Sequence, residues 1–209
     1  YSSVLAEEFD LSAPPYALIY LDEEFIDSLE PNDRERIELI GKRYFFGCEY
    51  IHPALNYSNA LTKKHLDSYD IENIFAFDVL IRNIDRKEKK PNIFFREKEY
   101  FLIDHEQSLD IRDSFAKYID DADKWPFIRG GGKGKHIFLK FLQKNKRKVD
   151  FNTFMTYMNV LNLTRLDDCV ETLKEKGVET SDYKPIKSYL VEVRFNQTKF
   201  LNLLLELIQ

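Results

Sequence analysis

The alternation of apolar and polar residues predicts a short mixed segment at the start of the chain. Val4–Phe9 has the spacing of the end of a helix, which closes before Ala13-Pro14-Pro15 because residues that precede proline avoid the helical region. Tyr16–Leu21 and Arg43–Ile51 are rich in aromatic and β-branched residues, as is typical of strands. Between them, Pro31–Leu39 is charged and begins with proline, which favours a solvated helix.

The pattern changes after residue 51, where helical spacing begins to dominate. Ile71–Arg82 carries apolar residues around most of its circumference, which predicts a buried central helix. Two short strands, Ile93–Phe95 and Tyr100–Ile103, follow and are separated by a charged turn of hairpin length. Further helical spacing, with a stop expected at Gly177, is found in four stretches: His136–Gln143, Asp150–Met158, Arg165–Lys176 and Tyr183–Gln209. The chain is therefore predicted to be an α+β protein, with a mixed segment at 1–51 and a mainly helical domain at 52–209.

Composition narrows the class of protein. The 209 residues are 44% hydrophobic and 14% aromatic, which is too apolar for a disordered chain. No apolar run approaches the roughly 20 residues of a membrane span, so no membrane partner is expected. The net charge of -5 argues against a dedicated nucleic-acid binder. Two cysteines are too few for a disulfide scaffold, which favours a reducing, cytoplasmic location.

Residues with metal-binding chemistry lie on either side of the predicted hairpin. Asp85 and Asn92 precede it, and Asp104 follows its second strand. Because a hairpin brings its outer ends together, we expect these three side chains to lie close to one another. Two carboxylates and an amide oxygen suit Mg²⁺ and leave room for phosphate oxygens, as phosphoryl transfer requires. Asp and Asn are also common in loops for local hydrogen-bonding reasons, so spacing alone leaves both interpretations open.

The 36-residue stretch FAFDVLIRNIDRKEKKPNIFFREKEYFLIDHEQSLD resembles the catalytic core of the HipA-like kinases, a bacterial branch of the protein-kinase-like fold. The family pattern is a helix ending in Asn-x-Asp-Arg, a loop with Pro-Asn, a hairpin, and Ile-Asp-His. Asn83-Ile84-Asp85-Arg86, Pro91-Asn92 and Ile103-Asp104-His105 match this pattern. The resemblance implies a kinase-like fold and an ATP- and Mg²⁺-dependent phosphotransferase, with Ser or Thr of a protein substrate as the acceptor.

The resemblance also implies roles for individual residues. Asp85 would be the catalytic base, and Arg86 would belong to the catalytic loop, where it braces the loop or faces phosphate. Asn92 and Asp104 would bind Mg²⁺. Backbone groups of the hinge would contact the adenine of ATP, namely those of Glu49, Tyr50 and Ile51. Segment 1–51 would be the trailing part of an N-lobe with its hinge strand, and 52–209 would be the helical C-lobe.

The N-terminal part departs from the kinase pattern. Kinases place a glycine-rich loop and a strand lysine over the phosphates, whereas no glycine precedes Gly41 and no lysine precedes Lys42. Three interpretations stay open: further N-lobe sequence upstream of residue 1, a partner chain that supplies the N-lobe, and a catalytically silent binding or toxin–antitoxin module. We favour the first, because the resemblance begins in the middle of a helix. Phosphorylation of a small molecule or a lipid would use the same nucleotide machinery.

Two basic features are interpreted without a special function. Arg129–Lys135 reads RGGGKGK but lacks the spacing of a Walker phosphate loop, so a flexible loop is expected. Between Phe127 and Val149 there are eight Lys or Arg residues and no acidic residue. Such a run is more often a solvated helix face than a nucleic-acid surface.

Overall fold

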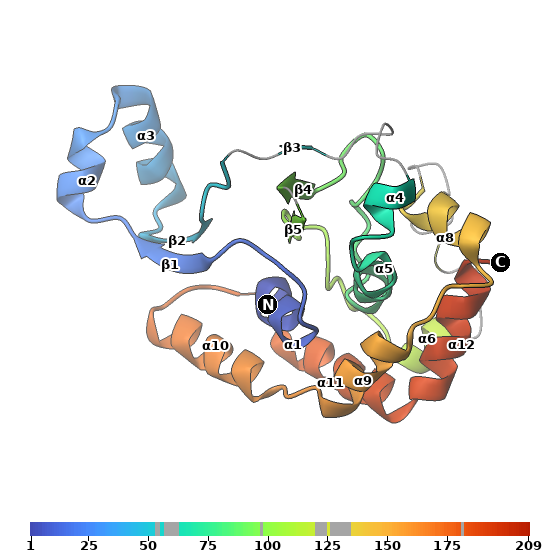
Figure 1. The fold of residues 1–209 in the computed structure, drawn as a ribbon. Helices are drawn as coiled ribbons and strands as arrows, with labels where there is room; N and C mark the ends of the chain where they lie inside the picture. The colour runs from blue at the N-terminus through green and yellow to red at the C-terminus, as the bar shows by residue number, and fades with distance from the viewer. Residues whose placement is uncertain (53–54, 57–62, 97, 120–124, 126–134, 181) are drawn as a thin grey trace.

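The computed structural model describes residues 1–52, 55–56, 63–96, 98–119, 125, 135–180 and 182–209 (Figure 1). The chain is a mixture of helices and small antiparallel sheets, which confirms the α+β prediction at this level. Within these residues, no helix has the length and apolar character needed to cross a membrane.

A connection that contains two prolines joins the first helix to the first sheet. Helix α1 (Ser2–Glu8) buries its apolar side, and Phe9, just after it, stacks on Phe154 with ring centroids 4.5 Å apart. Strand β1 (Tyr16–Tyr20) then pairs antiparallel with β2 (Tyr44–Cys48). The predicted strands are confirmed, although both end slightly earlier than expected.

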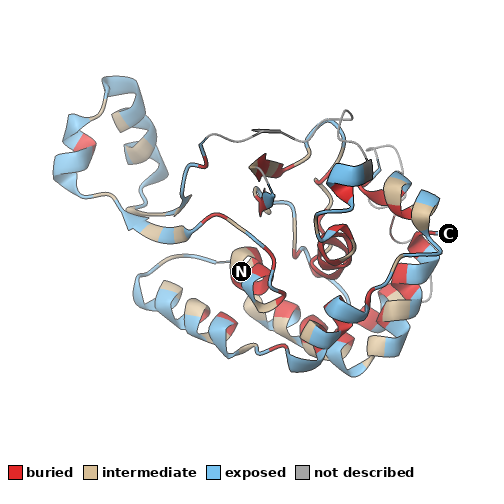
Figure 2. Ribbon diagram, in the orientation of Figure 1, coloured by how far each residue is buried: buried red, intermediate tan, exposed pale blue. Residues whose placement is uncertain are grey.

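Two helices are inserted between β1 and β2 and protrude from the rest of the molecule (Figure 1). Helix α2 (Glu23–Ser28) was not predicted; it begins where the Asp22 carboxylate accepts a hydrogen bond of 2.8 Å from the amide of Phe25. Helix α3 (Pro31–Ile40) was predicted, and each of its residues is at least partly exposed (Figure 2).

The predicted hairpin forms the main part of the second sheet. Strands β4 (Ile93–Arg96) and β5 (Glu99–Leu102) pair antiparallel, and β3 (Leu55–Asn56), which was not predicted, adds to the free edge of β4. The amide of Leu102 also donates a hydrogen bond of 2.8 Å to the carbonyl oxygen of Ser12. The hairpin is therefore tied to the segment that joins α1 to β1.

Helix α5 (Ile71–Leu80) is the centre of the core, as predicted. All its residues except Glu72 are buried, and Figure 2 shows it almost entirely in the buried colour. The other helices of this part of the chain are α4 (Lys63–Leu66), α6 (Phe115–Ile119), α8 (Leu139–Asn145), α9 (Asn152–Val160), α10 (Thr164–Glu175), α11 (Tyr183–Phe195) and α12 (Gln197–Leu207). The predicted helical stretch Tyr183–Gln209 is thus two helices, separated at Asn196.

Two helices end in the same way with different residues. Gly177 follows α10 at a φ of 65°, and its amide donates back to Lys174, which confirms the predicted stop. Arg82 takes the same left-handed conformation after α5, at a φ of 53°. The amide of Asn83 then donates to the carbonyl oxygen of Asp78 at 2.8 Å. The end of α5 therefore has no glycine to indicate it in the sequence. The left-handed Arg82 turns the chain directly into the loop that carries Asp85.

Two expectations stay predictions. The glycine-rich stretch expected as a loop lies outside the described residues, except for Lys135. The division into 1–51 and 52–209 is likewise untested, although α1 contributes Leu5 and Ala6 to the same apolar cluster as α5.

Candidate active site

The loop after α5 carries Asp85 on a backbone that is fixed by a buried amide. Asn83 is 1% exposed, and its Nδ2 donates a hydrogen bond of 2.8 Å to Asp78 Oδ1. The Asn83 Oδ1 accepts one of 3.0 Å from the amide of Asp85. Asn83 therefore links the position of Asp85 to the buried end of α5.

The structure brings Asp85, Asn92 and Asp104 together at the open end of the hairpin. The Asn92 Nδ2 donates to Asp85 Oδ2 at 3.4 Å and to the carbonyl oxygen of Asp104 at 3.3 Å. The amide of Ile103 donates to the carbonyl oxygen of Asn92 at 3.1 Å, which continues the hairpin pairing up to the site. The expectation that the outer ends of the hairpin would place these residues side by side is consistent with this geometry.

Two of the three residues have unusual backbone conformations. Asn92 and Asp104 have φ values of 48° and 53°, in the left-handed region. Asn and Asp tolerate this region better than most side chains, but it still costs free energy. Such residues gather at functional sites, where the surrounding structure holds them in place.

A lysine that sequence reasoning missed lies between the two carboxylates. Lys90 Nζ is 2.6 Å from Asp85 Oδ2 and 3.0 Å from Asp104 Oδ2. Lys87 Nζ lies 3.6 Å from Asp85 Oδ1. The sequence offers one hint of this contact, the several lysines between Asp85 and Asn92. From the sequence alone, however, lysines in such a charged loop are expected to point into solvent.

The opposite charges of this cluster stabilise the ionised forms of both Asp85 and Lys90. Burial tends to raise the pKa of Asp85, but the hydrogen bond and charge of Lys90, with smaller contributions from Lys87 and Asn92, hold that pKa below its usual value. Hydrogen bonds to Asp85 and Asp104 raise the pKa of Lys90. Asp85 is therefore ionised at neutral pH.

Behind the carboxylates lies a buried brace around Asp78 of α5. Both Asp78 and Arg86 have fully buried side chains, and Arg86 Nε donates to Asp78 Oδ2 at 2.5 Å. The guanidinium of Arg86 also donates to the carbonyl oxygen of Asn92 and faces His105 Nε2 at 3.0 Å. Arg86 therefore braces the loop, and its burial keeps it from the solvent-facing side of the site.

His136 completes the brace and is neutral. Its Nδ1 accepts from the amide of Phe138 at 3.2 Å, so its Nε2 carries the proton and donates to Asp78 Oδ2 at 2.9 Å. Burial lowers the pKa of His136, and burial with the charge of Arg86 lowers the pKa of His105 to about 4. Burial alone would raise the pKa of Asp78, but Arg86 and His136 outweigh it and lower that pKa. The brace thus holds one carboxylate and one guanidinium, with two neutral imidazoles.

A cavity of about 350 Å³ lies beside Asp104. Its lining includes Phe46 and Cys48 of β2 and Asp104 at the exit of the hairpin. The predicted hinge residues continue β2 past this wall: the amide of Glu49 donates to the carbonyl oxygen of Pro15 at 2.8 Å, Tyr50 is 83% exposed and Ile51 is buried. Their contact with adenine stays a prediction.

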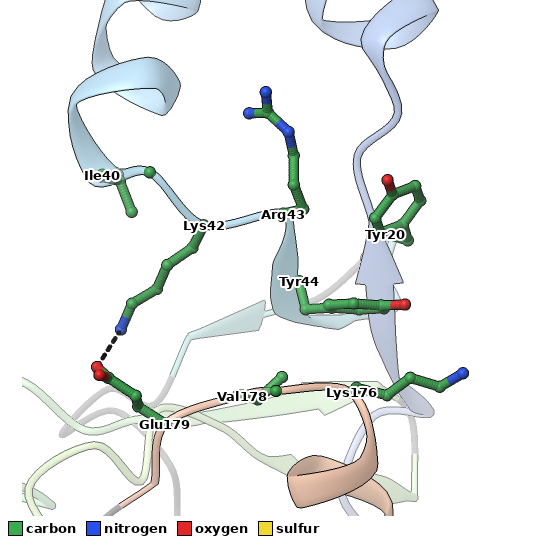
Figure 3. Close-up of a pocket in the computed structure, with 10 residues that line it drawn as sticks. Tyr20, Ile40, Lys42, Arg43, Tyr44, Lys176, Val178 and Glu179 are labelled. Atoms are coloured by element: carbon green, nitrogen blue, oxygen red, sulfur yellow. Dashed lines mark ion pairs between the residues drawn. The ribbon is translucent and has the colours of Figure 1, made fainter.

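A second cavity, of about 610 Å³, lies between the start of β2 and the turn after α10 (Figure 3). Tyr20 and Tyr44 stand on one side of it, and an ion pair of 3.6 Å between Lys42 and Glu179 spans the other side (Figure 3). None of the predicted site residues lines this cavity.

The donor set suits a metal ion that arrives with phosphate. Among the residues that the structure describes, no three His, Cys, Asp or Glu side chains are placed to hold a metal by themselves. Mg²⁺ needs less, because it binds through one or two carboxylates and completes its shell with water and phosphate oxygens. The Lys90 ammonium shows that a cation fits between Asp85 and Asp104. Asn92 would have to rotate its amide to offer Oδ1 as a ligand.

Comparison with known proteins places the chain in a family. The model of the HipA-like kinase family matches residues 1–156, which include every residue of the carboxylate cluster and of the brace. The match covers most of the chain, and the chain therefore belongs to the HipA-like kinase family. No curated protein and no solved structure matches the chain. Membership indicates kinase-type phosphotransfer, a reaction class that uses ATP and a metal ion.

Proposed function

We propose that the chain catalyses the Mg²⁺-dependent transfer of the γ-phosphate of ATP to a Ser or Thr hydroxyl of a protein. The observation that carries this proposal is the convergence of Asp85, Asn92 and Asp104 at the open end of the hairpin. Membership of the HipA-like kinase family supports it independently. Segment 1–51 would then be the trailing part of a kinase N-lobe with its hinge strand, and 52–209 would be the C-lobe.

Asp85 is proposed as the group that receives the proton of the acceptor hydroxyl. Its lowered pKa makes it ionised but a weak base. Its main contribution is therefore to orient the hydroxyl by accepting its hydrogen bond, with proton transfer late in the reaction. The link from its amide to Asn83 keeps the carboxylate in place without substrate.

Asn92 and Asp104 are proposed as the residues that hold Mg²⁺. When bound, the metal ion supplies positive charge that neutralises the phosphate oxygens during transfer. The chain contributes by fixing these two residues: Arg86 holds the carbonyl oxygen of Asn92, and the pairing of Ile103 with Asn92 joins both ends of the hairpin.

The nucleotide is proposed to lie in the cavity next to Asp104. Phe46 and Cys48 form part of its wall, and the backbone of Glu49–Ile51 follows directly after. This arrangement would place adenine near the end of β2 and the phosphates toward the carboxylates. The glycine-rich loop and the lysine of a kinase N-lobe would come from further sequence or from a partner chain.

The test compares ATP turnover by the native protein with turnover by Asp85→Ala and Asp104→Ala. Loss of Asp85 should lower turnover about 10²–10⁴-fold and leave ATP binding, measured by calorimetry, nearly unchanged. Asp110→Ala is the matched control, because Asp110 forms an exposed ion pair with Arg112 and takes no part in the carboxylate cluster. Equal turnover in all four proteins would refute the proposal.

A second candidate function is a catalytically silent binding module with a kinase-like core. The feature that favours it is that residues 1–41 contain no lysine, so this segment does not itself supply the ATP-binding lysine of a kinase. The same calorimetry separates the two candidates, since ATP binding without turnover by the native protein supports the silent module. A small-molecule or lipid kinase would turn over ATP with the same residues and would differ in the acceptor that becomes labelled.

A further inference from the structure

The loop between Asp85 and Asn92 folds back on itself and returns a lysine to the carboxylates. The amide of Lys87 donates to the carbonyl oxygen of Lys90 at 3.0 Å, and the amide of Lys90 donates to that of Lys87 at the same distance. Pro91 follows and restricts the backbone of Lys90 to extended conformations. The position of Lys90 is therefore set by a closed turn and a proline.

The Lys90 ammonium bridges the two carboxylates. Its Nζ lies 2.6 Å from Asp85 and 3.0 Å from Asp104, with Glu106 Oε1 third at 3.7 Å. Two carboxylates held this close repel each other, so a cation between them stabilises their arrangement. The ammonium lies against Asp104, the carboxylate proposed to bind the metal ion.

We propose that Lys90 is an internal counter-ion that keeps Asp85 and Asp104 in place until a divalent cation displaces its ammonium. The inference rests on the proposed function, because it takes Asp104 as a ligand of the metal ion and Asp85 as the base beside it. Lys90 acts as a positioning residue: it holds both carboxylates in place and competes with the cation for Asp104.

The surroundings of Lys90 allow this exchange. Its side chain is 46% exposed, so its ammonium can leave without the cost of burying or unburying a charge. Glu106, 66% exposed, offers a partner just outside the pair of carboxylates. The long lysine stem can follow this short displacement while the turn at 87–90 stays closed.

The same loop supplies a matched control. Lys89 is exposed and adjacent to Lys90, so Lys89→Gln removes the same charge from the same turn. Lys87 reaches Asp85 at 3.6 Å and is less suitable, because it also contacts the cluster. A comparison of Lys90→Gln with Lys89→Gln separates the bridging contact from the general loss of positive charge.

The first measurement is a titration of the native chain with Mn²⁺, which takes the same oxygen ligands as Mg²⁺. Broadening of the Leu102 and Ile103 amide resonances reports binding beside Asp104. We expect Lys90→Gln to bind Mn²⁺ roughly tenfold more tightly than the native chain, because the competing charge is gone. Lys89→Gln should differ little from the native chain, and Lys90→Arg should restore the weaker binding.

The second measurement is thermal unfolding in a chelator. Without its counter-ion the carboxylate pair is less stable, so Lys90→Gln should unfold about 2–4 °C below Lys89→Gln, and excess Mn²⁺ should remove the difference. Equal or weaker Mn²⁺ binding by Lys90→Gln than by Lys89→Gln would overturn the role of Lys90 alone. Absence of Mn²⁺ binding near Asp104 in every variant would overturn both this inference and the proposed metal site.

Discussion

Asp85 and Arg86 are neighbours in the sequence, yet they belong to ion pairs of opposite kinds. Arg86 pairs with Asp78, and both side chains are 0% exposed. Asp85 pairs with Lys90, and the exposed fractions of these two side chains are 14% and 46%. The peptide bond between the two residues therefore separates the interior of the protein from its solvent-facing site.

The two ion pairs differ in whether their members can change partners. A buried charge that loses its partner costs several kcal/mol, so Asp78 and Arg86 cannot change partners. An exposed pair contributes little to stability and can be replaced by other charges. The loop is thus fixed from behind by Arg86 and open in front at Asp85, which suits a site where cations and substrates exchange over a rigid base.

The largest effect is expected from breaking the buried pair. Arg86→Met leaves the Asp78 carboxylate buried without its main counter-charge and should lower the free energy of unfolding by about 3–5 kcal/mol. Asp85→Asn should change it by less than about 1 kcal/mol, because its partner Lys90 is 46% exposed and stays solvated without it. Urea unfolding followed by circular dichroism measures both. Similar losses in the two variants would show that the two ion pairs contribute equally to stability.

The next effect is a pH dependence of the brace. Folded His136 stays neutral because burial lowers its pKa, whereas in the unfolded chain it takes up a proton below its ordinary pKa of about 6.5. The unfolded state then binds more protons, so stability should fall as the pH falls below about 6.5, by up to about 1.4 kcal/mol per pH unit for one histidine. The loss continues until the pH reaches the lowered pKa of the folded state.

His136→Gln tests this assignment, since glutamine keeps a neutral donor toward Asp78 and does not titrate. The variant should have a shallower dependence of stability on pH between about 6.5 and 5. His105, whose folded pKa is about 4, contributes in the same direction and leaves a residual slope. A slope equal to that of the native protein would exclude His136 as a contributor.

A smaller effect is expected at Asn92, where backbone and side chain can be separated. Its φ of 48° favours glycine or asparagine, so Asn92→Ala should lower the free energy of unfolding by about 1–2 kcal/mol. Asn92→Gly keeps the conformation and removes the amide, so it should be the more stable variant. Both should lose ATP turnover if the amide binds the metal ion. Turnover retained by Asn92→Gly would assign Asn92 a purely conformational role.

The elements that the sequence predicts well are those with a strong local signal. Ile71–Leu80 is apolar around most of its circumference and lies at the centre of the core, and the hairpin strands are short, mainly apolar runs on either side of a charged turn. The expected neighbourhood of Asp85 and Asp104 followed from hairpin geometry alone. Gly177 ends α10 because only glycine takes its conformation without strain.

Other features have no local signal. Arg82 takes the conformation of a helix-ending glycine, held by contacts that include the face of the Tyr118 ring, 3.8 Å from its guanidinium carbon. His136 reaches Asp78 from 58 positions along the chain. The bridging position of Lys90 depends on the register of a turn, and a lysine in a charged loop is usually solvated. These contacts are tertiary, so neither periodicity nor composition reveals them.

The smallest effect is expected at the other end of the hairpin, which extends the comparison to a third ion pair. Arg96 and Glu99 face each other across the tip at 2.8 Å, with side chains 39% and 61% exposed. This pair is not buried like that of Asp78 and Arg86, and it holds no second carboxylate. Glu99→Gln should therefore lower the free energy of unfolding by less than about 1 kcal/mol, and by still less in 1 M salt.

Arg96→Ala should lower the free energy of unfolding somewhat more than Glu99→Gln, because the Arg96 guanidinium also lies 5.0 Å from the centroid of the Phe101 ring. Urea unfolding at low and high salt separates the two contributions: the part of the Arg96→Ala loss that survives in salt belongs to the ring contact. A loss at Glu99 as large as that at Arg86 would show that exposure does not decide which ion pairs of this loop and hairpin are structural.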